Sequence, residues 1–556
     1  MSGTAARTVL DTAFGDGARL AALLGAGQAS KVAPAGAWLH YVAVVPIGWD
    51  SRSGPLILRD SPPVRLDHAG DFHRWNLENA RLRLTLCAGE TGDVLEQLHL
   101  QADEVWWLHP ISHHSPNLNA KTLAGLCQPG AIVHMSTKWA ALNGWQAAGF
   151  ALLGPDEATQ YGQSIDPSAT HVRLAFTPPW RLRRTRQIQR TAWATPARCA
   201  IVGAGVSGVA LADAMARRGW DVTVLDAHPH PAQGGSGVPA ALIAPLPSAD
   251  DNPATRLTRH GLRWMRQTLH ALSARGLLRQ GQDWEASGAT RVLDGGQRLW
   301  QSEGLWLRPD ALVRAWLAHP QIQFRGGARV ARISRHAAVW QLDGEDGTLL
   351  AQAELVVVAG ALGSQQLLAP LAIDPRAANA LSALHAAYGT VSMGLADSSI
   401  PLPTAPVNGA GSLIPSVPGT PEGQSRRWLV GADFSAQPLP TAQAHAANLL
   451  RMQVLAPDMH AAWLAEAAHQ TPRALAHWQG QRCVSHDRMP VVGPLLAAPD
   501  ASLWISAGMG ARGMAWAGVC AEWLAAHISG EPWPLARSLS RHVDSQRRRP
   551  HIRNPA

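Results

Sequence analysis

The most constraining feature of this sequence is a glycine-rich turn at residues 203–208, which read G-A-G-V-S-G. An apolar strand-like run, 198–202, precedes the turn, and a helix-like run, 209–218, follows it. In such a unit the first glycine makes the tight turn, the second lets a pyrophosphate approach the backbone, and the third lets helix and strand pack closely. The phosphates then lie at the positive N-terminus of the helix. The pattern predicts a dinucleotide-binding βαβ unit.

A second strand and an acidic residue extend this pattern. Residues 221–225 alternate in a strand-like manner and end at Asp226, 23 residues after Gly203. A carboxylate at this position can accept hydrogen bonds from both ribose hydroxyls of a dinucleotide. We therefore predict that the cofactor-binding residues include Gly203, Gly205, Gly208 and Asp226.

More distant segments indicate which dinucleotide is bound. A strand-like run at 329–333 and a hairpin-like segment at 339–344 precede an apolar strand, 354–358, that ends in a turn of small residues. Residues 504–513 form another strand–glycine–helix junction, whose helix N-terminus could stabilise negative charge on a reduced flavin. This ordered set favours FAD over NAD. It adds the following cofactor-binding candidates: Val330, Gly360, Gly508, Gly510 and Gly513.

The first part of the chain begins an α/β pattern of its own. A strand-like run at 7–13 leads through Gly15 and Gly17 into a helix-like run at 18–24, and further apolar runs alternate with helical stretches. A chain that begins a nucleotide fold twice is most simply two domains. We expect an α/β protein in which a Rossmann-like N-terminal domain precedes a doubly wound nucleotide-binding domain with a mixed-sheet substrate domain.

The expected boundaries follow from composition. We predict a Rossmann-like domain at 1–177, an Arg-rich linker at 178–196, an oxidoreductase at 197–540 and a basic tail at 541–556. The Pro- and Gly-rich residues 401–421 are predicted to form a long surface loop or a hairpin insertion.

Charge and cysteine usage limit the partners. The formal net charge of +8 suits a polyanion, although only three of the 48 basic residues are lysines, so genomic base composition is an equally good explanation of the arginine excess. The five cysteines are scattered and form no C-x-x-C pair, and no apolar run reaches 18 residues. We expect a cytoplasmic protein with neither a metal site nor a membrane segment.

Three segments in the second half carry a family resemblance: residues 234–245 (G-G-S-G through A-L-I-A-P), 480–493 (G-Q-R-C through D-R-M-P-V-V-G) and 510–522 (G-A-R-G through C-A-E). In this order they resemble the bacterial bifunctional tRNA 5-methylaminomethyl-2-thiouridine biosynthesis (MnmC) family. The resemblance covers nearly the whole chain and is strong from residue 197 to about 537. It adds Ser236 and Gly237 to the cofactor-binding candidates.

The resemblance implies a two-step change of the tRNA wobble uridine. A flavin-dependent oxidation of a carboxymethylaminomethyl group releases glyoxylate and leaves an aminomethyl group, which the first half then methylates from S-adenosylmethionine. Arg482 and Arg512 are the candidates for holding the substrate carboxylate, because a planar guanidinium pairs bidentately with carboxylates.

The first half departs from the family pattern. The first glycine of the expected turn is Ala13, residues 39–49 contain no carboxylate for the ribose, and His109 stands where the family has an aspartate. Gly15, Gly17 and Asp93 are retained. Each departure removes a hydrogen-bond acceptor at a typical cost of about 1–3 kcal/mol. We therefore expect poor binding of S-adenosylmethionine, and we favour a degenerate half kept for tRNA binding or folding over a working methyltransferase.

Two alternatives remain at this point: a free glycine, sarcosine or D-amino-acid oxidase that acts without tRNA, and a flavoprotein whose first half is only a binding module. An Arg-rich junction, with arginines at 181, 183, 184, 186 and 190, and a methyltransferase-like half favour the tRNA enzyme over a free-amino-acid oxidase. The adjacent His113 and His114 have no further ligands at suitable spacing, so they do not predict a metal site.

Overall fold

A computed structural model describes the chain at residues 6–25, 38–107, 116–136, 142–155, 171–180, 193, 195–396, 400–419, 423–469, 475–497 and 500–547. The chain divides into two compact units. Unit 1 comprises Met1–Thr195 and Glu522–Arg541, and unit 2 comprises Pro196–Ala521 and His542–Ala556. This differs from the predicted boundaries, because residues 522–541 group with the first unit and not with the oxidoreductase.

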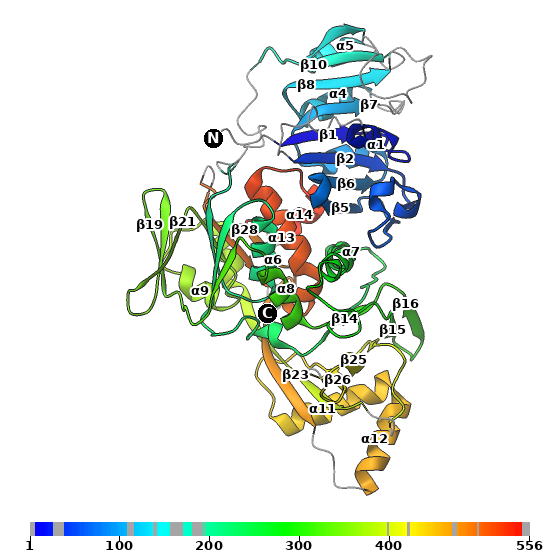
Figure 1. The fold of residues 1–556 in the computed structure, drawn as a ribbon, viewed down its shortest axis with the longest axis vertical. Helices are drawn as coiled ribbons and strands as arrows, with labels where there is room; N and C mark the ends of the chain where they lie inside the picture. The colour runs from blue at the N-terminus through cyan, green and yellow to red at the C-terminus, as the bar shows by residue number, and fades with distance from the viewer. Residues whose placement is uncertain are drawn as a thin grey trace, which may run out of the picture. The chain divides into compact units, whose positions relative to one another are not determined.

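Unit 1 is built on an eight-stranded sheet in the order β5-β6-β2-β1-β7-β8-β10-β9 (Figure 1). The five strands β6, β2, β1, β7 and β8 are parallel. At one edge β5 pairs antiparallel with β6, and at the other β10 pairs antiparallel with both β8 and β9. All residues of β2 and β6 are buried, as expected for parallel strands that are covered on both faces. The strands are β1 (Arg7–Asp11), β2 (Leu39–Val45), β5 (Phe72–Leu77), β6 (Leu82–Ala88), β7 (Ala102–Trp107), β8 (Cys127–Ser136), β9 (Phe150–Pro155) and β10 (His171–Phe176), with a small pair β3 (Trp49–Asp50) and β4 (Arg65–Leu66).

The helices of unit 1 are short: α1 (Ala18–Gly25), α3 (Thr91–Gln97), α4 (Pro116–Ala124) and α5 (Leu142–Ala147). The strand order reverses between β1 and β7, which makes the carboxyl ends of these two strands the topological switch point of the sheet. The prediction of an α/β fold for this half is therefore confirmed.

A buried ionic cluster joins the sheet of unit 1 to residues 522–541. Arg83 donates to Glu531 at 2.7 Å, and Arg74 lies 3.5 Å from Glu522 and 3.8 Å from Glu531. All four side chains are at most 8% exposed. Because an isolated buried charge is costly, the C-terminal carboxylates are part of what allows two arginines to lie on β5 and β6.

Unit 2 contains a six-stranded sheet in the order β18-β12-β11-β22-β29-β28. All of its strands are parallel except β28 at the edge. The strands are β11 (Arg198–Val202), β12 (Asp221–Leu225), β18 (Ile322–Arg325), β22 (Leu355–Val358), β28 (Val491–Pro494) and β29 (Leu503–Ala507). Helices α6 (Val206–Ala216) and α13 (Gly513–Ser529) follow β11 and β29, which confirms the two predicted strand–glycine–helix junctions.

A seven-stranded mixed sheet forms the second layer of unit 2, in the order β16-β15-β24-β25-β26-β23-β27. Helices α11 (Thr441–Leu455) and α12 (Pro457–His469) lie beside it (Figure 1). The strands are β15 (Ala289–Val292), β16 (Arg298–Gln301), β23 (Leu384–Leu395), β24 (Val407–Asn408), β25 (Ser412–Val417), β26 (Arg427–Gly431) and β27 (Ala476–Ser485).

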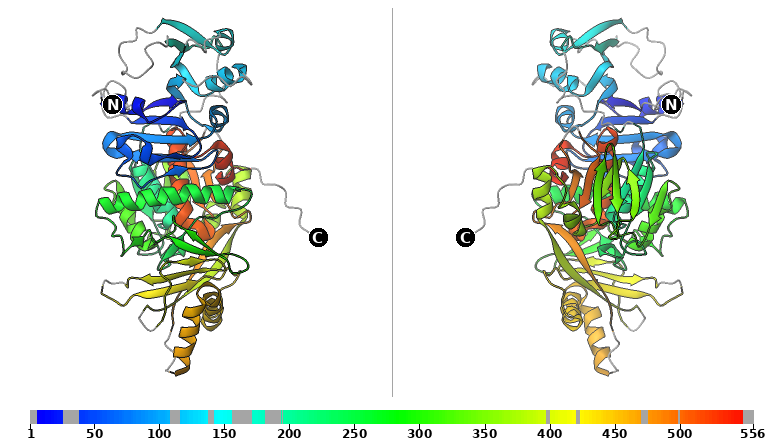
Figure 2. Two further views of the ribbon diagram at one scale, coloured as in Figure 1. Left: turned by 90° about the vertical axis from the view of Figure 1, so that its right-hand side faces the viewer. Right: turned by 90° about the vertical axis from the view of Figure 1, so that its left-hand side faces the viewer.

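The remaining elements of unit 2 are two small sheets and several helices. Two three-stranded sheets comprise β13 (Ala241–Ile243), β17 (Leu305–Leu307) and β14 (Trp284–Glu285), and β19 (Arg332–His336), β20 (Val339–Asp343) and β21 (Leu349–Ala353). The longest helix, α7 (Pro253–Ala274), is the long green helix in the left view of Figure 2. The other helices of unit 2 are α8 (Pro309–Leu317), α9 (Gly363–Leu368) and α10 (Pro375–Ser382), and most of α14 (Arg537–Val543) belongs to unit 1.

The segment 401–421 is more central than a surface loop. Its strands β24 and β25 pair with each other and lie inside the seven-stranded sheet, where Leu413 and Ile414 are buried. The hairpin alternative of the prediction is therefore correct, and the surface-loop alternative is wrong. The segment contains two short strands with apolar side chains, although its composition is rich in proline and glycine. No helix within the described ranges is long and apolar enough to cross a membrane.

Candidate functional site

The candidate site is a cavity of about 720 Å³ in unit 2. Its lining includes the residues at the carboxyl ends of four parallel strands, β11, β12, β22 and β29, and residues of β23, β26 and β27 from the seven-stranded sheet. A crevice at the carboxyl ends of parallel strands, at the point where the strand order reverses, is where open α/β sheets bind their ligands. Here the order reverses between β11 and β22.

The glycine turn has the geometry that the sequence predicts. Gly203 has φ +114°, and a Cβ there would lie 2.6 Å from the carbonyl oxygen of Ala359. A Cβ on Gly208 would lie 2.0 Å from the carbonyl oxygen of Gly203, so this glycine allows α6 to pack on the turn. Gly205 precedes the first residue of α6 and lines the cavity, where its missing side chain leaves the helix N-terminus accessible.

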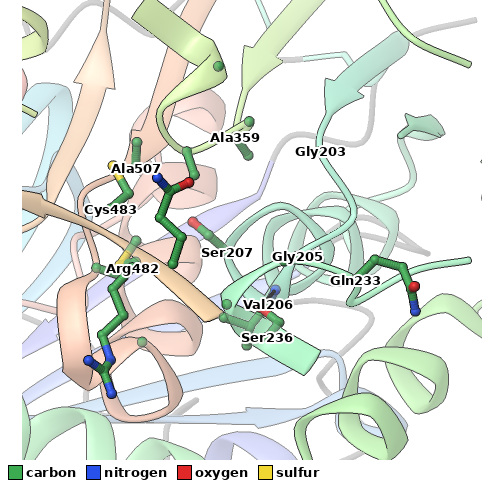
Figure 3. A pocket seen from close by; sticks show the side chains of 18 of the residues that line it. Gly203, Gly205, Val206, Ser207, Gln233, Ser236, Ala359, Arg482, Cys483 and Ala507 are labelled. Atoms are coloured by element: carbon green, nitrogen blue, oxygen red, sulfur yellow. Dashed lines mark hydrogen bonds between the residues drawn. The ribbon is translucent and has the colours of Figure 1, made fainter. Parts of the chain in front are cut away.

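Asp226 and Ser236 line the cavity on either side of this turn. The Asp226 carboxylate accepts hydrogen bonds from the amides of Ala204 at 2.6 Å and His228 at 2.8 Å, one on each oxygen. The hydroxyl of Ser236 accepts from the amide of Val206 at 2.9 Å, beside Gly205 (Figure 3). Each carboxylate oxygen retains a lone pair for a ribose hydroxyl, and the Ser236 hydroxyl retains its proton for a phosphate oxygen.

The cavity fits a dinucleotide in one further respect. Ser364, in α9, is fully buried, lines the cavity and has no hydrogen-bond partner for its hydroxyl among the described residues. A buried hydroxyl without a partner is unusual, and a polar ligand in the cavity would satisfy it.

Arg482 projects from β27 into the same cavity (Figure 3). Its Nη1 donates to the carbonyl oxygens of Asp433 at 2.9 Å and Tyr388 at 3.3 Å. The guanidinium lies on Gly389 of β23, where a Cβ would come within 2.4 Å of it. Burial lowers the pKa of Arg482, and the charge of Asp433 partly opposes this shift. The contacts orient a cation at the cavity while its Nε and Nη2 retain donors for a ligand.

The other predicted residues divide into two groups. Val330, Gly360, Gly508, Gly510 and Gly513 line the cavity. Gly208, Gly237 and Arg512 are not part of the lining. The Arg512 guanidinium lies 5.4 Å from the centroid of the Trp516 ring, and burial followed by the nearby charge of Arg488 lowers its pKa. Gly237 closes a short turn in which a Cβ would meet the carbonyl oxygen of Ala232 at 2.8 Å.

Several lining residues were not predicted as site residues from the sequence. They come from separate loops and strands: Ser207, Gln233, Ser364, Asp433, Phe434, Trp478, Gln481 and Cys483. Ser207 lies in the glycine turn, and Gln481 and Cys483 flank Arg482 in the segment 480–493, so the motifs offered a signal for these three residues and not for the other five. Burial raises the pKa of the Cys483 thiol to about 11, which keeps it protonated near neutral pH.

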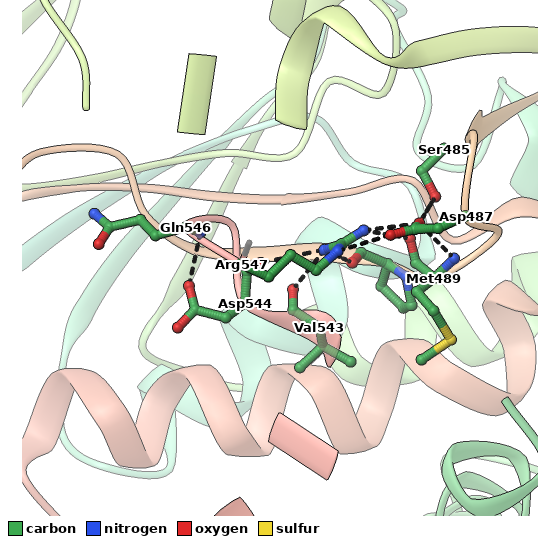
Figure 4. A network of polar contacts seen from close by, with 8 residues as sticks. Ser485, Asp487, Met489, Val543, Asp544, Gln546 and Arg547 are labelled. Atoms are coloured by element: carbon green, nitrogen blue, oxygen red, sulfur yellow. Dashed lines mark hydrogen bonds and ion pairs between the residues drawn. The ribbon is translucent and has the colours of Figure 1, made fainter. Parts of the chain in front are cut away.

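The turn after β27 is held by the C-terminal segment of unit 2 (Figure 4). Arg547 donates to both carboxylate oxygens of Asp487 at 2.9 Å and to the carbonyl oxygen of Pro490 at 2.7 Å. The hydroxyl of Ser485 shares its single proton between two acceptors, the Asp487 carboxylate at 2.8 Å and the carbonyl oxygen of Met489 at 2.6 Å. Burial disfavours ionisation of Asp487, but the hydrogen bonds and charge of Arg547 outweigh it and lower the pKa of this carboxyl.

Unit 1 has a second candidate site after β1. Asp11 is fully buried and accepts hydrogen bonds from Nε and Nη2 of Arg19, both at 2.9 Å, and from the hydroxyl of Tyr41 at 2.6 Å. Arg19 also donates to the carbonyl oxygen of Ala13. Burial and the Asp11 charge raise the pKa of Tyr41 well above its ordinary value. The Asp11 carboxylate at the end of β1 is therefore already paired within the chain.

The rest of the predicted N-terminal features are only partly described. Gly15 and Gly17 have positive φ angles, and Asp93 is exposed in the first turn of α3. His109, His113, His114 and the Arg-rich cluster at 181–190 lie outside the described residues. Within the described part of the chain, no group of three or more His, Cys, Asp or Glu side chains could hold a metal ion.

Comparisons with known proteins identify the cofactor of unit 2 and the family of the chain. Residues 198–527 match the family described as FAD dependent oxidoreductase, which also identifies FAD as the cofactor of unit 2. The chain is 36% identical over 97% of its length to the tRNA 5-methylaminomethyl-2-thiouridine biosynthesis bifunctional protein MnmC of Albidiferax ferrireducens, covering 92% of that protein. It is 34% identical to the MnmC of Paracidovorax citrulli over 98% of this chain and 92% of the relative.

Among solved structures, glycine oxidase from Geobacillus kaustophilus has a TM-score of 0.49 and 18% identity, covering 60% of this chain and 96% of that one. The sequence relatives extend across both units at more than 30% identity. The chain therefore belongs to the family of tRNA 5-methylaminomethyl-2-thiouridine biosynthesis bifunctional proteins, MnmC, and its second unit is an FAD-dependent oxidoreductase.

Proposed function

We propose that this protein modifies the wobble uridine of tRNA by oxidising a carboxymethylaminomethyl substituent at its CH–NH bond. The names of its relatives, MnmC proteins over most of the chain, support this proposal over a free-amino-acid oxidase. Removal of two electrons and two protons converts the amine to an imine, and addition of water then releases glyoxylate and leaves an aminomethyl group. FAD supplies the two-electron oxidation when it is bound.

The chain's own residues would bind and orient the reactants. Gly203, Gly205 and the N-terminus of α6 would hold the pyrophosphate, Asp226 the ribose, and Ser236 and Ser364 polar groups of the cofactor. The N-terminus of α13, which follows Gly510, would stabilise negative charge on the reduced flavin.

The observation that carries the proposal is the position of Arg482. Its guanidinium lies in the flavin cavity, oriented by two carbonyl oxygens, with Nε and Nη2 directed to no described partner. A planar guanidinium with donors remaining is suited to a carboxylate, which is the group that distinguishes a glycine-like amine from other amines. Arg512 remains the second candidate, although a change of side-chain position would be needed to bring it into the cavity lining.

Arg482→Ala tests this assignment. The variant should keep its FAD, because Arg482 makes no contact with the glycine turn, and it should lose binding of the carboxymethylaminomethyl substrate. Loss of a bidentate charge-assisted pair costs about 1.5–3 kcal/mol, which corresponds to roughly 10- to 150-fold in affinity. Wild-type rates on carboxymethylaminomethyl tRNA would place the carboxylate elsewhere. Nucleoside analysis of tRNA from a deletion strain that carries this protein tests the substrate itself.

For unit 1 we propose a methyltransferase-like domain of Rossmann type that binds S-adenosylmethionine poorly. The pairing of Asp11 with Arg19 and Tyr41 supports this, because a cationic ligand amine would have to displace an internal arginine. The remaining contribution of this half would be to tRNA binding, and we place the protein in the cytoplasm, where tRNA is modified.

A further inference from the structure

Phe434 is an exposed aromatic side chain in the lining of the flavin cavity. It follows the end of β26, and 53% of its surface is accessible. A large apolar side chain that is half exposed inside a binding cavity is available for contact with a ligand, whereas the same exposure on an open surface would require no explanation.

The backbone on both sides of Phe434 is held in place. The carboxylate of Asp433 accepts hydrogen bonds from the amide of Thr390 at 2.7 Å and from the hydroxyl of Ser435 at 2.8 Å. The amides of Ser435 and Tyr388 each donate to the carbonyl oxygen of the other residue, at 3.2 Å and 2.8 Å. The segment that contains Phe434 is therefore hydrogen-bonded to β23. Because its backbone is already ordered, Phe434 loses little conformational entropy when it binds a ligand.

Arg482 lies next to this ring. Its Cζ atom is 5.8 Å from the centroid of Phe434, and one of its two carbonyl contacts is to Asp433, the residue before the ring. A carboxylate bound by Arg482 therefore belongs to a ligand whose neighbouring atoms come within reach of Phe434. In the proposed substrate, a carboxymethylaminomethyl chain of only a few bonds separates the carboxylate from a uracil ring.

The other aromatic residue of this wall has a different environment. Trp478 is partly buried and packs against an apolar cluster that includes Trp306 and Ile414. Its ring also covers Gly480, where a Cβ would lie within 2.1 Å of the indole. Trp478 is therefore a structural part of the wall, and Phe434 is the aromatic face that remains accessible.

We propose that Phe434 is the stacking platform for the uracil ring that carries the carboxymethylaminomethyl group. The proposal rests on the proposed function, since a free glycine-like substrate has no ring to stack. Aromatic side chains bind splayed-out bases of single-stranded RNA through their π-faces, and anticodon loops present such bases. Arg482 then binds the carboxylate of the substituent, and Phe434 stacks on the uracil ring that carries the substituent.

The test uses the full chain with bound FAD and an anticodon stem–loop RNA that carries carboxymethylaminomethyluridine at the wobble position. Phe434→Ala and Phe434→Leu should weaken binding of this RNA about 5- to 150-fold, the range for loss of one base–aromatic stack. KM should rise by a similar factor while kcat changes little, and Phe434→Tyr and Phe434→Trp should restore affinity. The flavin content of each variant confirms that it is folded.

Trp300→Leu is the matched control. Trp300 is 56% exposed on β16 and does not line the cavity, so its loss should leave RNA affinity and KM unchanged. Wild-type affinity in flavin-loaded Phe434→Leu, or an equal loss in Trp300→Leu, would overturn the stacking role while the proposed function stands. A wild-type protein that leaves the modified stem–loop unoxidised would instead remove the proposed function, and the stacking role with it.

Discussion

At the residue scale, the glycines of the flavin site differ in what they tolerate. A Cβ at Gly203 or Gly208 would collide with backbone atoms at 2.6 Å and 2.0 Å. A Cβ at Gly205 would meet only the hydroxyl of Ser236, at 3.3 Å. Gly205 is thus the position at which a substitution can obstruct the cofactor without preventing the turn from forming.

Gly205→Trp should accordingly give folded but colourless protein, because the indole would occupy the space that the pyrophosphate needs beside the N-terminus of α6. Gly205→Ala is the control and should retain most of its flavin. The visible absorbance of the purified variants measures this directly. Normal flavin content in folded Gly205→Trp would contradict the assignment of the glycine turn.

Asp487 makes a pH-dependent contribution to stability. Its pKa is lowered in the folded protein, so the stabilisation is present above the unfolded value of about 3.9 and is lost as the pH falls through the folded value. Asp487→Asn should therefore lower the unfolding midpoint at pH 7, and the difference from wild type should shrink below about pH 4. Thermal unfolding at several pH values measures it, and a pH-independent difference would contradict the ionic role of Arg547.

At the scale of elements, the glycine turn between β1 and α1 of unit 1 is spanned by an internal ion pair. Arg19, the second residue of α1, pairs with Asp11 at the end of β1 and donates to the carbonyl oxygen of Ala13. In unit 2, the corresponding junction of β11 and α6 keeps its helix N-terminus open to a cavity. A strand–turn–helix unit therefore occurs twice in this chain. In unit 1 an internal arginine pairs with the acid at the turn, whereas in unit 2 the helix N-terminus faces a cavity.

We expect titration calorimetry of the full chain with S-adenosylmethionine to show weak or undetectable binding, because the ligand's amine would compete with Arg19 for Asp11. tRNA from a deletion strain rescued by this protein should then accumulate aminomethyl, and not methylaminomethyl, uridine. Micromolar affinity together with methyl transfer would show instead that Arg19 moves aside, and the bifunctional activity would stand in full.

At the scale of the whole molecule, residues from the two ends of the sequence form one unit. Glu531 follows α13, the last long helix of the chain, yet its carboxylate lies 2.7 Å from Arg83 in β6. Arg83 is 2% exposed, and Glu531 is a carboxylate that balances its buried charge. The N-terminal half is therefore expected to need residues 522–541 for its stability.

Glu531→Gln should destabilise unit 1 substantially, since loss of one partner from a buried pair costs about 3–5 kcal/mol. Arg52→Gln, which removes an exposed ion pair in the same unit, should have little effect. Thermal unfolding with flavin content as a separate readout distinguishes the units, because unit 2 should keep its FAD. Equal midpoints for Glu531→Gln and wild type would contradict the dependence of unit 1 on this carboxylate.

The sequence by itself determined the parts that depend on local geometry. The glycine turn, the strands at 198–202 and 221–225, and the helices after residues 205 and 512 follow from periodicity and from φ angles and close approaches that only glycine allows. FAD and the family also followed from motifs, because each motif lies within one short segment.

Only the tertiary structure decided which separate segments meet. Ser364 and Phe434 join Arg482 in one cavity, although each lies in a segment without a motif. Arg547 reaches the turn at Asp487, and Glu531 reaches Arg83, across 60 and 448 positions of the chain. Such contacts arise because layers pack to bury apolar surface and to pair buried charges, and no local pattern in the sequence encodes which distant partner will be used.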